Sequence, residues 1–223
     1  MKIVFLGPPN SGKGTYAKRI APTLGLTYIS TSGLFFEAAE KGLEYGKKAV
    51  EYINKGYPVP NEISAGVIIE RLSEPDCEKG YILDTPYNKE QAELIDKNEK
   101  TKVDVVINVV VPEEILIRRG TSRITCKNCK WIYNTLTLKP LTEGVCDKCG
   151  GELFQREDDK EEKIKIRLEE YKKRASPMEE YYKEQGKIED IEWKHEMIPE
   201  GDIDIPIDTM LNKIIEILNK NKE

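Results

Sequence analysis

The chain has 223 residues, 34% of them charged, and a formal net charge of -5 at pH 7. This length predicts one substantial core that can carry small inserted lobes. The charged fraction favours a soluble protein, and the acidic balance argues against broad nucleic-acid binding, which requires basic surfaces. The apolar runs are too short for a membrane span or a signal peptide, so we expect a cytoplasmic protein without a membrane partner.

The first segment predicts a strand, a glycine-rich turn and a helix. "KIVFL" (residues 2–6) is typical of a buried strand, and "GPPNSGKGT" (residues 7–15) follows it directly. From Lys13 onward, apolar residues recur at helical spacing. In such a turn, backbone N–H groups surround an anion, Lys13 reaches the β- and γ-phosphates, and the Thr15 hydroxyl faces Mg²⁺. The pattern predicts nucleotide binding, and a chance glycine-rich turn is the alternative.

Further along the chain, strand and helix patterns alternate. The other strand candidates are residues 27–30, 80–83, 103–111 and about 187–193. This alternation predicts an α/β fold with a mostly parallel sheet and helices on both faces. Two segments interrupt it, namely residues 31–60, which are largely helical and polar, and residues 122–159, which contain most of the cysteines.

The last third of the chain predicts two helices. Asp158 and Asp159 precede "KEEKIKIRLEEYKKR" and are expected to supply the N-cap of a long helix, and Pro177 is expected to mark its end. "TMLNKIIEILNK" (residues 209–220) predicts an amphipathic C-terminal helix.

Four of the five cysteines form two Cys-x-x-Cys pairs, Cys126 with Cys129 and Cys146 with Cys149. The spacing predicts a zinc ribbon, in which four thiolates surround one Zn²⁺ and leave no open position, so the metal is structural. Two redox or disulfide pairs are the alternative, which the expected cytoplasmic location disfavours. Cys77 stands alone, and we expect no chemical role for it.

One aspartate and several arginines are candidates for the chemistry. "ILDTPYNKEQ" (residues 82–91) places Asp84 at the end of a predicted buried strand, where a carboxylate is costly unless it holds something. Phosphoryl transfer needs planar, bidentate donors around the phosphates. The arginines that flank the cysteine segment are predicted to supply them: Arg119, Arg123, Arg156 and Arg167. Arg118 and Arg174 are interpreted as solvated helix charges.

Taken together, these motifs resemble adenylate kinase, in its long form with a zinc-binding lid. The resemblance extends over nearly the whole chain and includes "GPPNSGKGTYAKRIAPTLGLTYIST", "KGYPVPNE", "GYILD", the paired cysteines and "QREDDKEEKIKIRLEEY". It implies a P-loop NTPase-type core formed by residues 1–29, 61–121 and 160–223. Residues 30–60 would form a nucleoside-monophosphate-binding lobe. Residues 122–159 would form a lid that closes over ATP and excludes water, a motion for which adenylate kinase is itself a standard example.

The resemblance also implies an activity and a set of site residues. The activity is Mg²⁺-dependent transfer of the γ-phosphoryl group of ATP to a nucleoside monophosphate, most simply AMP. The implied catalytic residues are Lys13, Arg123, Arg156, Arg167 and Asp84, with Asp84 orienting waters on Mg²⁺. The implied ATP-binding residues are Gly7, Gly12, Lys13, Gly14, Thr15, Arg119, Arg123 and Tyr133. The implied acceptor-binding residues are Thr31, Phe36, Tyr57, Val59, Tyr87, Gln91, Arg156 and Arg167. For Tyr133, as for Trp131, packing around the zinc knuckle is the alternative role.

The acceptor side departs from the family pattern at two positions. Family members usually have an arginine that grips the acceptor phosphate where this chain has Tyr87, and a second arginine where it has Phe36. One hypothesis is a kinase with relaxed acceptor choice, in which Lys89 or another base partly substitutes. A second is a nucleotide-binding or regulatory relative with little transfer, and a third is a zinc-ribbon nucleic-acid binder. The first is favoured because a complete donor side has little use without transfer.

Overall fold

A five-stranded parallel sheet forms the centre of the molecule, with the strand order β2-β3-β1-β4-β8. The structure is a computed structural model and describes residues 1–31, 33–55, 57, 59–84, 88–200, 202 and 204–220. The strands are β1 (Lys2–Leu6), β2 (Thr27–Ser30), β3 (Tyr81–Asp84), β4 (Val105–Val110) and β8 (Ile188–Glu192). The predicted fold class is confirmed, and each predicted strand overlaps an observed one.

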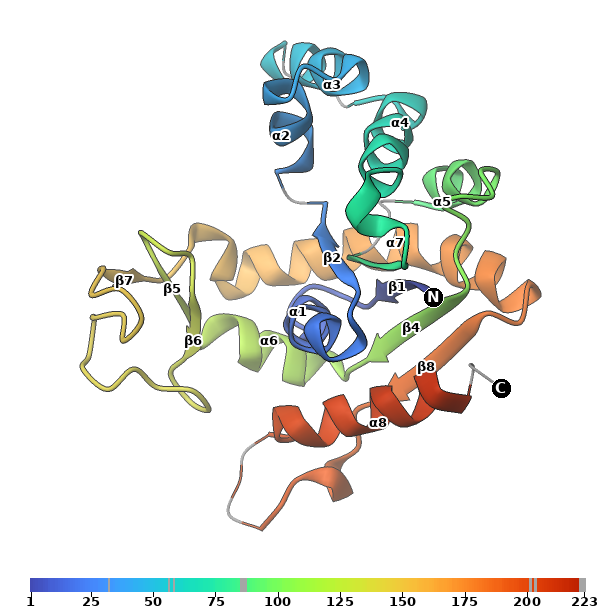
Figure 1. Cartoon of the computed structure of the whole chain (residues 1–223). Helices are drawn as coiled ribbons and strands as arrows, with labels where there is room; N and C mark the ends of the chain where they lie inside the picture. Colours follow the sequence, from blue (N-terminus) through green and yellow to red (C-terminus); the bar gives the residue numbers. More distant parts are fainter. Residues whose placement is uncertain are drawn as a thin grey trace.

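Helices cover both faces of this sheet (Figure 1). In β1, Ile3 and Phe5 pack with α1 (Lys13–Leu24), α8 (Ile207–Lys220) and α6 (Glu113–Thr121). Val4 and Leu6 belong to the opposite cluster, with α4 (Asn61–Leu72) and α5 (Lys89–Asp96). Because both faces are covered, the strand is apolar at every interior position, as is usual in parallel sheets. Short 3₁₀ helices lie at η1 (Pro75–Cys77), η2 (Glu157–Asp159) and η3 (His195–Met197). Among the described residues, no helix is long and apolar enough to cross a membrane.

A helical lobe stands away from one end of the sheet, between β2 and α4 (Figure 1). It consists of α2 (Leu34–Glu40) and α3 (Glu44–Asn54). The two helices approach closely at Gly46, where a Cβ would lie 2.5 Å from the backbone carbon of Ala38. Tyr45 of α3 in turn lies against Gly66 of α4, where a Cβ would be 2.6 Å from the tyrosine ring. Glycine at position 46 therefore allows α2 and α3 to pack closely, and glycine at position 66 allows α3 to pack against α4.

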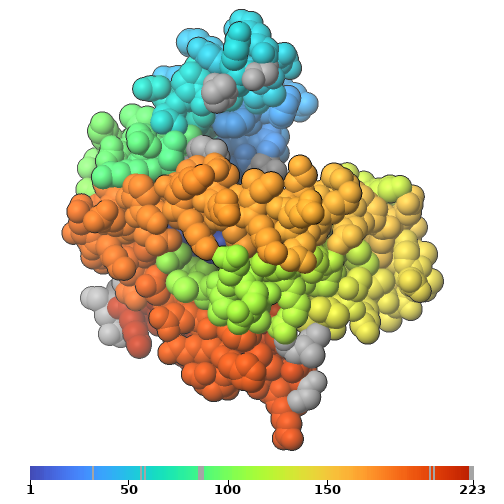
Figure 2. Space-filling model, turned by 180° about the vertical axis from the view of Figure 1, so that it is seen from behind, coloured from blue at the N-terminus to red at the C-terminus, as the bar shows by residue number. Residues whose placement is uncertain are grey.

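A second small unit lies between α6 and α7, at another edge of the molecule (Figure 1). Its sheet is antiparallel, with the order β6-β5-β7. The strands are β5 (Arg123–Cys126), β6 (Ile132–Asn134) and β7 (Leu153–Phe154). Seen from behind, α7 (Glu161–Glu184) runs from this unit across the back of the core (Figure 2). A long helix thus links the small sheet to the core.

Two predictions about α7 are wrong. The helix begins at Glu161 with Lys160 as N-cap residue and without a side-chain cap, because Asp159 is bonded to Arg123 instead. It also continues through Pro177 to Glu184. A proline inside a helix removes one backbone hydrogen bond. The fully buried side chains of Met178 and Tyr182 lie beyond Pro177, and their packing in the core keeps the chain helical.

Candidate functional site

The phosphate-loop motif, residues 7–15, leaves the carboxyl end of β1 and enters α1. Gly7 has φ +145°, and a Cβ there would lie 2.7 Å from Ser11 Oγ and 3.0 Å from the carbonyl oxygen of Val109. Gly12 has φ +92°, and a Cβ there would lie 2.9 Å from the ring of Tyr16. Only glycine fits these two positions. Gly12 is also the N-cap of α1 and provides no side-chain cap, so the first N–H groups of this helix can bind an anion.

Lys13 begins α1 directly after this loop, and Asp84 ends the neighbouring strand β3, from where its carboxylate interacts electrostatically with Lys13. Burial of Lys13 lowers the pKa of its ammonium group, the carboxylate of Asp84 opposes that shift, and Arg167 and Arg123 add to it. Asp84 Oδ2 lies 3.4 Å from the position that a Cβ on Gly14 would take. The hydroxyl of Thr31, at the end of β2, donates to the carbonyl oxygen of Asp84 at 3.3 Å. Ligands of open α/β sheets bind at this edge.

Three predicted arginines converge around η2. Arg123 donates through Nε to both carboxylate oxygens of the fully buried Asp159 at 3.1 Å, and its Nη2 donates to Oδ1 as well. Arg156 Nη2 donates to Asp158 Oδ2 at 3.0 Å, and Arg167 Nη1 to the Asp158 carbonyl oxygen at 3.4 Å. Burial lowers the pKa of Arg167, and the charge of Arg123 lowers it further. Clustered guanidinium groups of this kind are suited to a phosphate ligand.

The fourth predicted arginine, Arg119, contacts the phosphate loop directly. Its Nη1 donates to the carbonyl oxygen of Ser11 at 3.0 Å. Its Nε and Nη2 donate to the two carboxylate oxygens of Asp204 at 2.6 and 2.7 Å. Sequence reasoning missed Asp204, because 85 residues separate it from Arg119 and no motif marks the segment before α8.

The four predicted cysteine ligands come together in the small sheet, with all four sulfur atoms within 4.8 Å of one another. Cys126 Sγ lies 3.5 Å from Cys149 Sγ, and Cys129 Sγ lies 3.6 Å from Cys146 Sγ. All four thiols are free, which excludes the disulfide alternative in this structure. Four sulfurs bound at about 2.3 Å to one tetrahedral ion would be about 3.8 Å apart, so the cluster fits a metal ion.

The environment of the cysteine cluster lowers the pKa of Cys126 and Cys146, whereas it raises the pKa of Cys129 to about 12. Burial raises the pKa of Cys146, but hydrogen bonds from Tyr133 and the backbone outweigh it and lower this pKa to about 6. The Tyr133 hydroxyl donates to Cys146 Sγ at 3.6 Å, and its ring is 3% exposed. Tyr133 and Trp131 thus pack around the cysteines, which is the alternative role that the sequence predicted for them. ATP binding by Tyr133 stays a prediction.

Gln91, one of the predicted acceptor-binding residues, lies in a hydrogen-bond network at the N-termini of α4 and α5. Asn88 caps α5 by accepting from the backbone N–H of Gln91 at 3.0 Å. Asn61 Oδ1, at the start of α4, accepts from Asn88 Nδ2 at 2.9 Å and from Gln91 Nε2 at 3.3 Å. Asn61 and Asn88 thereby fix the position of Gln91, and the sequence analysis did not identify either role.

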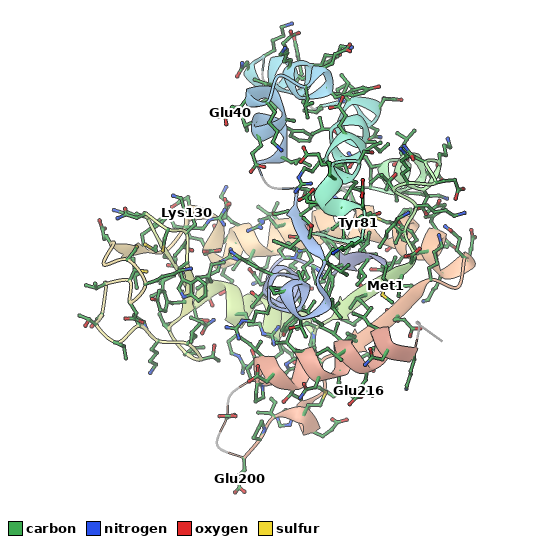
Figure 3. The ribbon with its side chains drawn as sticks, in the orientation of Figure 1. Met1, Glu40, Tyr81, Lys130, Glu200 and Glu216 are labelled. Carbon is green, nitrogen blue, oxygen red and sulfur yellow. The ribbon has the colours of Figure 1, made fainter. Side chains whose placement is uncertain are left out.

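Two of the remaining acceptor predictions fall on exposed positions. Phe36 is 50% exposed and Tyr57 is 63% exposed, whereas Val59 packs partly against the core. Tyr87 lies outside the described residues. Lys89 Nζ lies 3.8 Å from Glu93 Oε1 and over the ring of Tyr181. The helical lobe, labelled at Glu40, and the cysteine unit, labelled at Lys130, are separate projections from the core (Figure 3).

Comparison with known proteins matches the sequence of this chain to one family. A family model described as adenylate kinase matches residues 5–187. An adenylate kinase of Archaeoglobus fulgidus is 48% identical over 196 residues, which cover 86% of this chain and 90% of that protein. An adenylate kinase of Thermodesulfovibrio yellowstonii is 42% identical over 99% of this chain and its own full length. An adenylate kinase of Thermosipho melanesiensis is 38% identical over 99% of this chain and 100% of its own length.

Proposed function

The chain belongs to the adenylate kinase family and is a phosphotransferase of the nucleoside monophosphate kinase class, and we propose that it transfers the γ-phosphoryl group of ATP to AMP. The observation that carries this proposal is the phosphate loop followed by Lys13, whose ammonium group interacts electrostatically with Asp84, Arg123 and Arg167. These charges come from α1, β3, β5 and α7. Cations at that density are suited to a polyphosphate whose charge shifts during transfer.

On this proposal each group has a distinct task. The loop N–H groups and the N-terminus of α1 hold the β-phosphate, and Lys13 neutralises charge shared by the β- and γ-phosphates. Thr15 and Asp84 offer the hard oxygen atoms that Mg²⁺ prefers, and Mg²⁺ bound with ATP would neutralise phosphate charge. Arg123, Arg156 and Arg167 hold the phosphoryl group during its transfer and hold the acceptor phosphate in line.

We assign residues 122–159 as the lid and residues 30–60 as the acceptor lobe. Arg123 and Arg156 lie close to the two ends of the assigned lid, and Arg167 lies beyond it in α7. Movement of the lid would therefore carry Arg123 and Arg156 toward the phosphates or away from them. Closure would remove water from the γ-phosphoryl group, which favours transfer to the acceptor over hydrolysis.

We assign Zn²⁺ as the metal held by Cys126, Cys129, Cys146 and Cys149. Support comes from the four free sulfur atoms, which match the ligand number and softness that this ion prefers. Four protein ligands leave no open coordination position, so the metal is structural and takes no part in the transfer.

For the acceptor, we propose that the enzyme binds the phosphate weakly and has low specificity for the base. Phe36 stands on the acceptor lobe as an exposed aromatic side chain that cannot bind a phosphate. Aromatic faces stack on any nucleobase. The amides of Asn61, Asn88 and Gln91 supply hydrogen bonds on the base side of the lobe.

The test is kcat/KM with ATP and Mg²⁺ for AMP, CMP, UMP and GMP in the wild type and in two variants. Phe36→Arg adds one charge-assisted hydrogen bond to the phosphate, which contributes roughly 1.5–3 kcal/mol. We therefore expect KM for every acceptor to fall by about 10-fold or more at 1.36 kcal/mol per decade. Phe36→Gln, which removes the ring without adding charge, should not lower KM.

The possible outcomes separate the two parts of the proposal. If the wild type uses AMP near ~10⁷ M⁻¹s⁻¹, toward the upper end of the ordinary enzyme range, and the other acceptors far more slowly, relaxed choice is wrong and the kinase assignment stands. If ATP binds but none of the four acceptors is phosphorylated, the chain is a nucleotide-binding relative and the proposed activity fails.

A further inference from the structure

A largely buried ion pair joins the end of α6 to the segment that precedes α8. Arg119 Nε donates to Asp204 Oδ2 at 2.6 Å, and Nη2 donates to Oδ1 at 2.7 Å. The two side chains are only 15% and 11% exposed. This is a bidentate guanidinium–carboxylate pair, which fixes orientation as well as distance. Because the pair lies beside the phosphate loop, the orientation of Arg119 affects how a nucleotide can bind there.

The same guanidinium group is tied to the phosphate loop. Arg119 Nη1 donates to the carbonyl oxygen of Ser11, a fully buried residue between the two loop glycines. Each of the three guanidinium nitrogens therefore already donates a hydrogen bond within the protein. Three of the five N–H donors are thus engaged, which leaves the planar face and two N–H groups for a ligand, and Asp204 sets the orientation of both.

Asp204 is itself held from two further directions. Its Oδ1 accepts from Trp193 Nε1 at 2.9 Å and from the backbone N–H of Ile205 at 2.8 Å. Burial raises the pKa of Asp204, but the hydrogen bond and charge of Arg119 outweigh burial and lower it. The carboxylate is thus ionised at neutral pH and fully engaged. Trp193 follows β8, so the end of the sheet supports the carboxylate.

We propose that Asp204 is a positioning residue for the donor nucleotide, acting through Arg119 and supported by Trp193. The proposal rests on the proposed function, because it takes ATP as the ligand of the phosphate loop. With Asp204 in place, the guanidinium is fixed before the nucleotide arrives, so binding does not have to order it. Without Asp204, Arg119 keeps its bond to Ser11 but loses the two that set its plane, and the donor binds less tightly. The acceptor lobe is built from other elements and should be unaffected.

The experiment measures the dissociation constant of ATP by calorimetry, together with KM for ATP, KM for AMP and kcat. For Asp204→Asn we expect ATP binding to weaken about 5- to 30-fold, with KM for AMP and kcat within about 3-fold of the wild type. Trp193→Phe keeps an aromatic side chain, although a smaller one, and removes the indole N–H, and it should weaken ATP binding about 2- to 5-fold. Asp202→Asn is the matched control, since Asp202 is an exposed aspartate of the same segment.

A double-mutant comparison separates positioning from simple support of the fold. In an Arg119→Ala background, Asp204→Asn should weaken ATP binding no further. A purely structural role would lower the melting temperature and leave the ATP dissociation constant of the folded protein unchanged, and that result overturns the proposal. So would a full additional loss in the Arg119→Ala background. If Asp204→Asn does not fold, Trp193→Phe is used for the test. Unchanged ATP binding in Trp193→Phe would then overturn the proposal.

Because ATP binding is measured directly, the outcome does not depend on phosphoryl transfer. A wild type that binds ATP but transfers nothing would defeat the proposed function and leave this test intact. Normal transfer with unchanged ATP binding in Asp204→Asn and Trp193→Phe would defeat the positioning role alone.

Discussion

Replacing Lys13 with methionine is expected to lower kcat/KM for phosphoryl transfer by about 10²–10³-fold or more, the usual effect of removing one preorganised group that stabilises transition-state charge. Methionine is unbranched and only one heavy atom shorter than lysine, so the variant removes the ammonium group with little other change in shape. Burial lowers the pKa of this ammonium group, as do the positive charges of Arg167 and Arg123. The charge is therefore unfavourable in the free protein, and its loss should leave the melting temperature unchanged or slightly higher.

Lys18→Met is the matched control. Lys18 is an exposed residue of the same helix, and its replacement should change neither activity nor melting temperature by a measurable amount. A folded Lys13→Met protein that retains more than about a tenth of wild-type activity would contradict the assigned role, because that loss corresponds to only ~1.4 kcal/mol.

Removal of the metal is expected to unfold the lid and leave the core folded. The buried cluster of the lid consists of Cys126, Tyr133, Cys146 and Leu153, so two of its four members are predicted metal ligands. Thiolate sites contribute roughly 10–16 kcal/mol of apparent binding free energy in isolated zinc-finger peptides. So small a cluster cannot replace that contribution by apolar packing alone.

The measurement combines metal analysis with hydrogen exchange before and after chelation. We expect one Zn²⁺ per chain, loss of amide protection in residues 122–159 after chelation, and loss of activity with it. Cys146→Ser should reproduce the effect, whereas Cys77→Ser should not change metal content, since Cys77 is a buried cysteine outside the cluster. Protein purified without chelators that contains no metal, or a lid whose protection survives chelation, would contradict the assignment.

Local patterns were predictable from the sequence because they depend on near neighbours in the chain. The strand, glycine turn and helix around Lys13 follow from residue type and spacing, and so does the cysteine cluster. Burial of β1 on both faces requires a run of apolar residues, which can be recognised in the sequence.

Pairings between distant residues could not be predicted in this way. Asp159 was expected to cap α7 because aspartate before a helix usually does so. It binds Arg123 instead, 36 residues away, because a buried guanidinium needs a carboxylate partner. The same holds for Asp204 and Arg119. In α7, core packing of Met178 and Tyr182 outweighs the local preference of Pro177 to end a helix.

Passage of the γ-phosphoryl group from ATP to a nucleoside monophosphate can be followed with a label on that group. The protein is incubated with Mg²⁺ and ATP labelled in the γ-phosphoryl group, with and without AMP. The account predicts that label lost from ATP appears in the ADP formed from AMP, and that little inorganic phosphate is released when AMP is absent. Label that reaches inorganic phosphate at the same rate with and without AMP, or that stays in ATP with every acceptor, would contradict it.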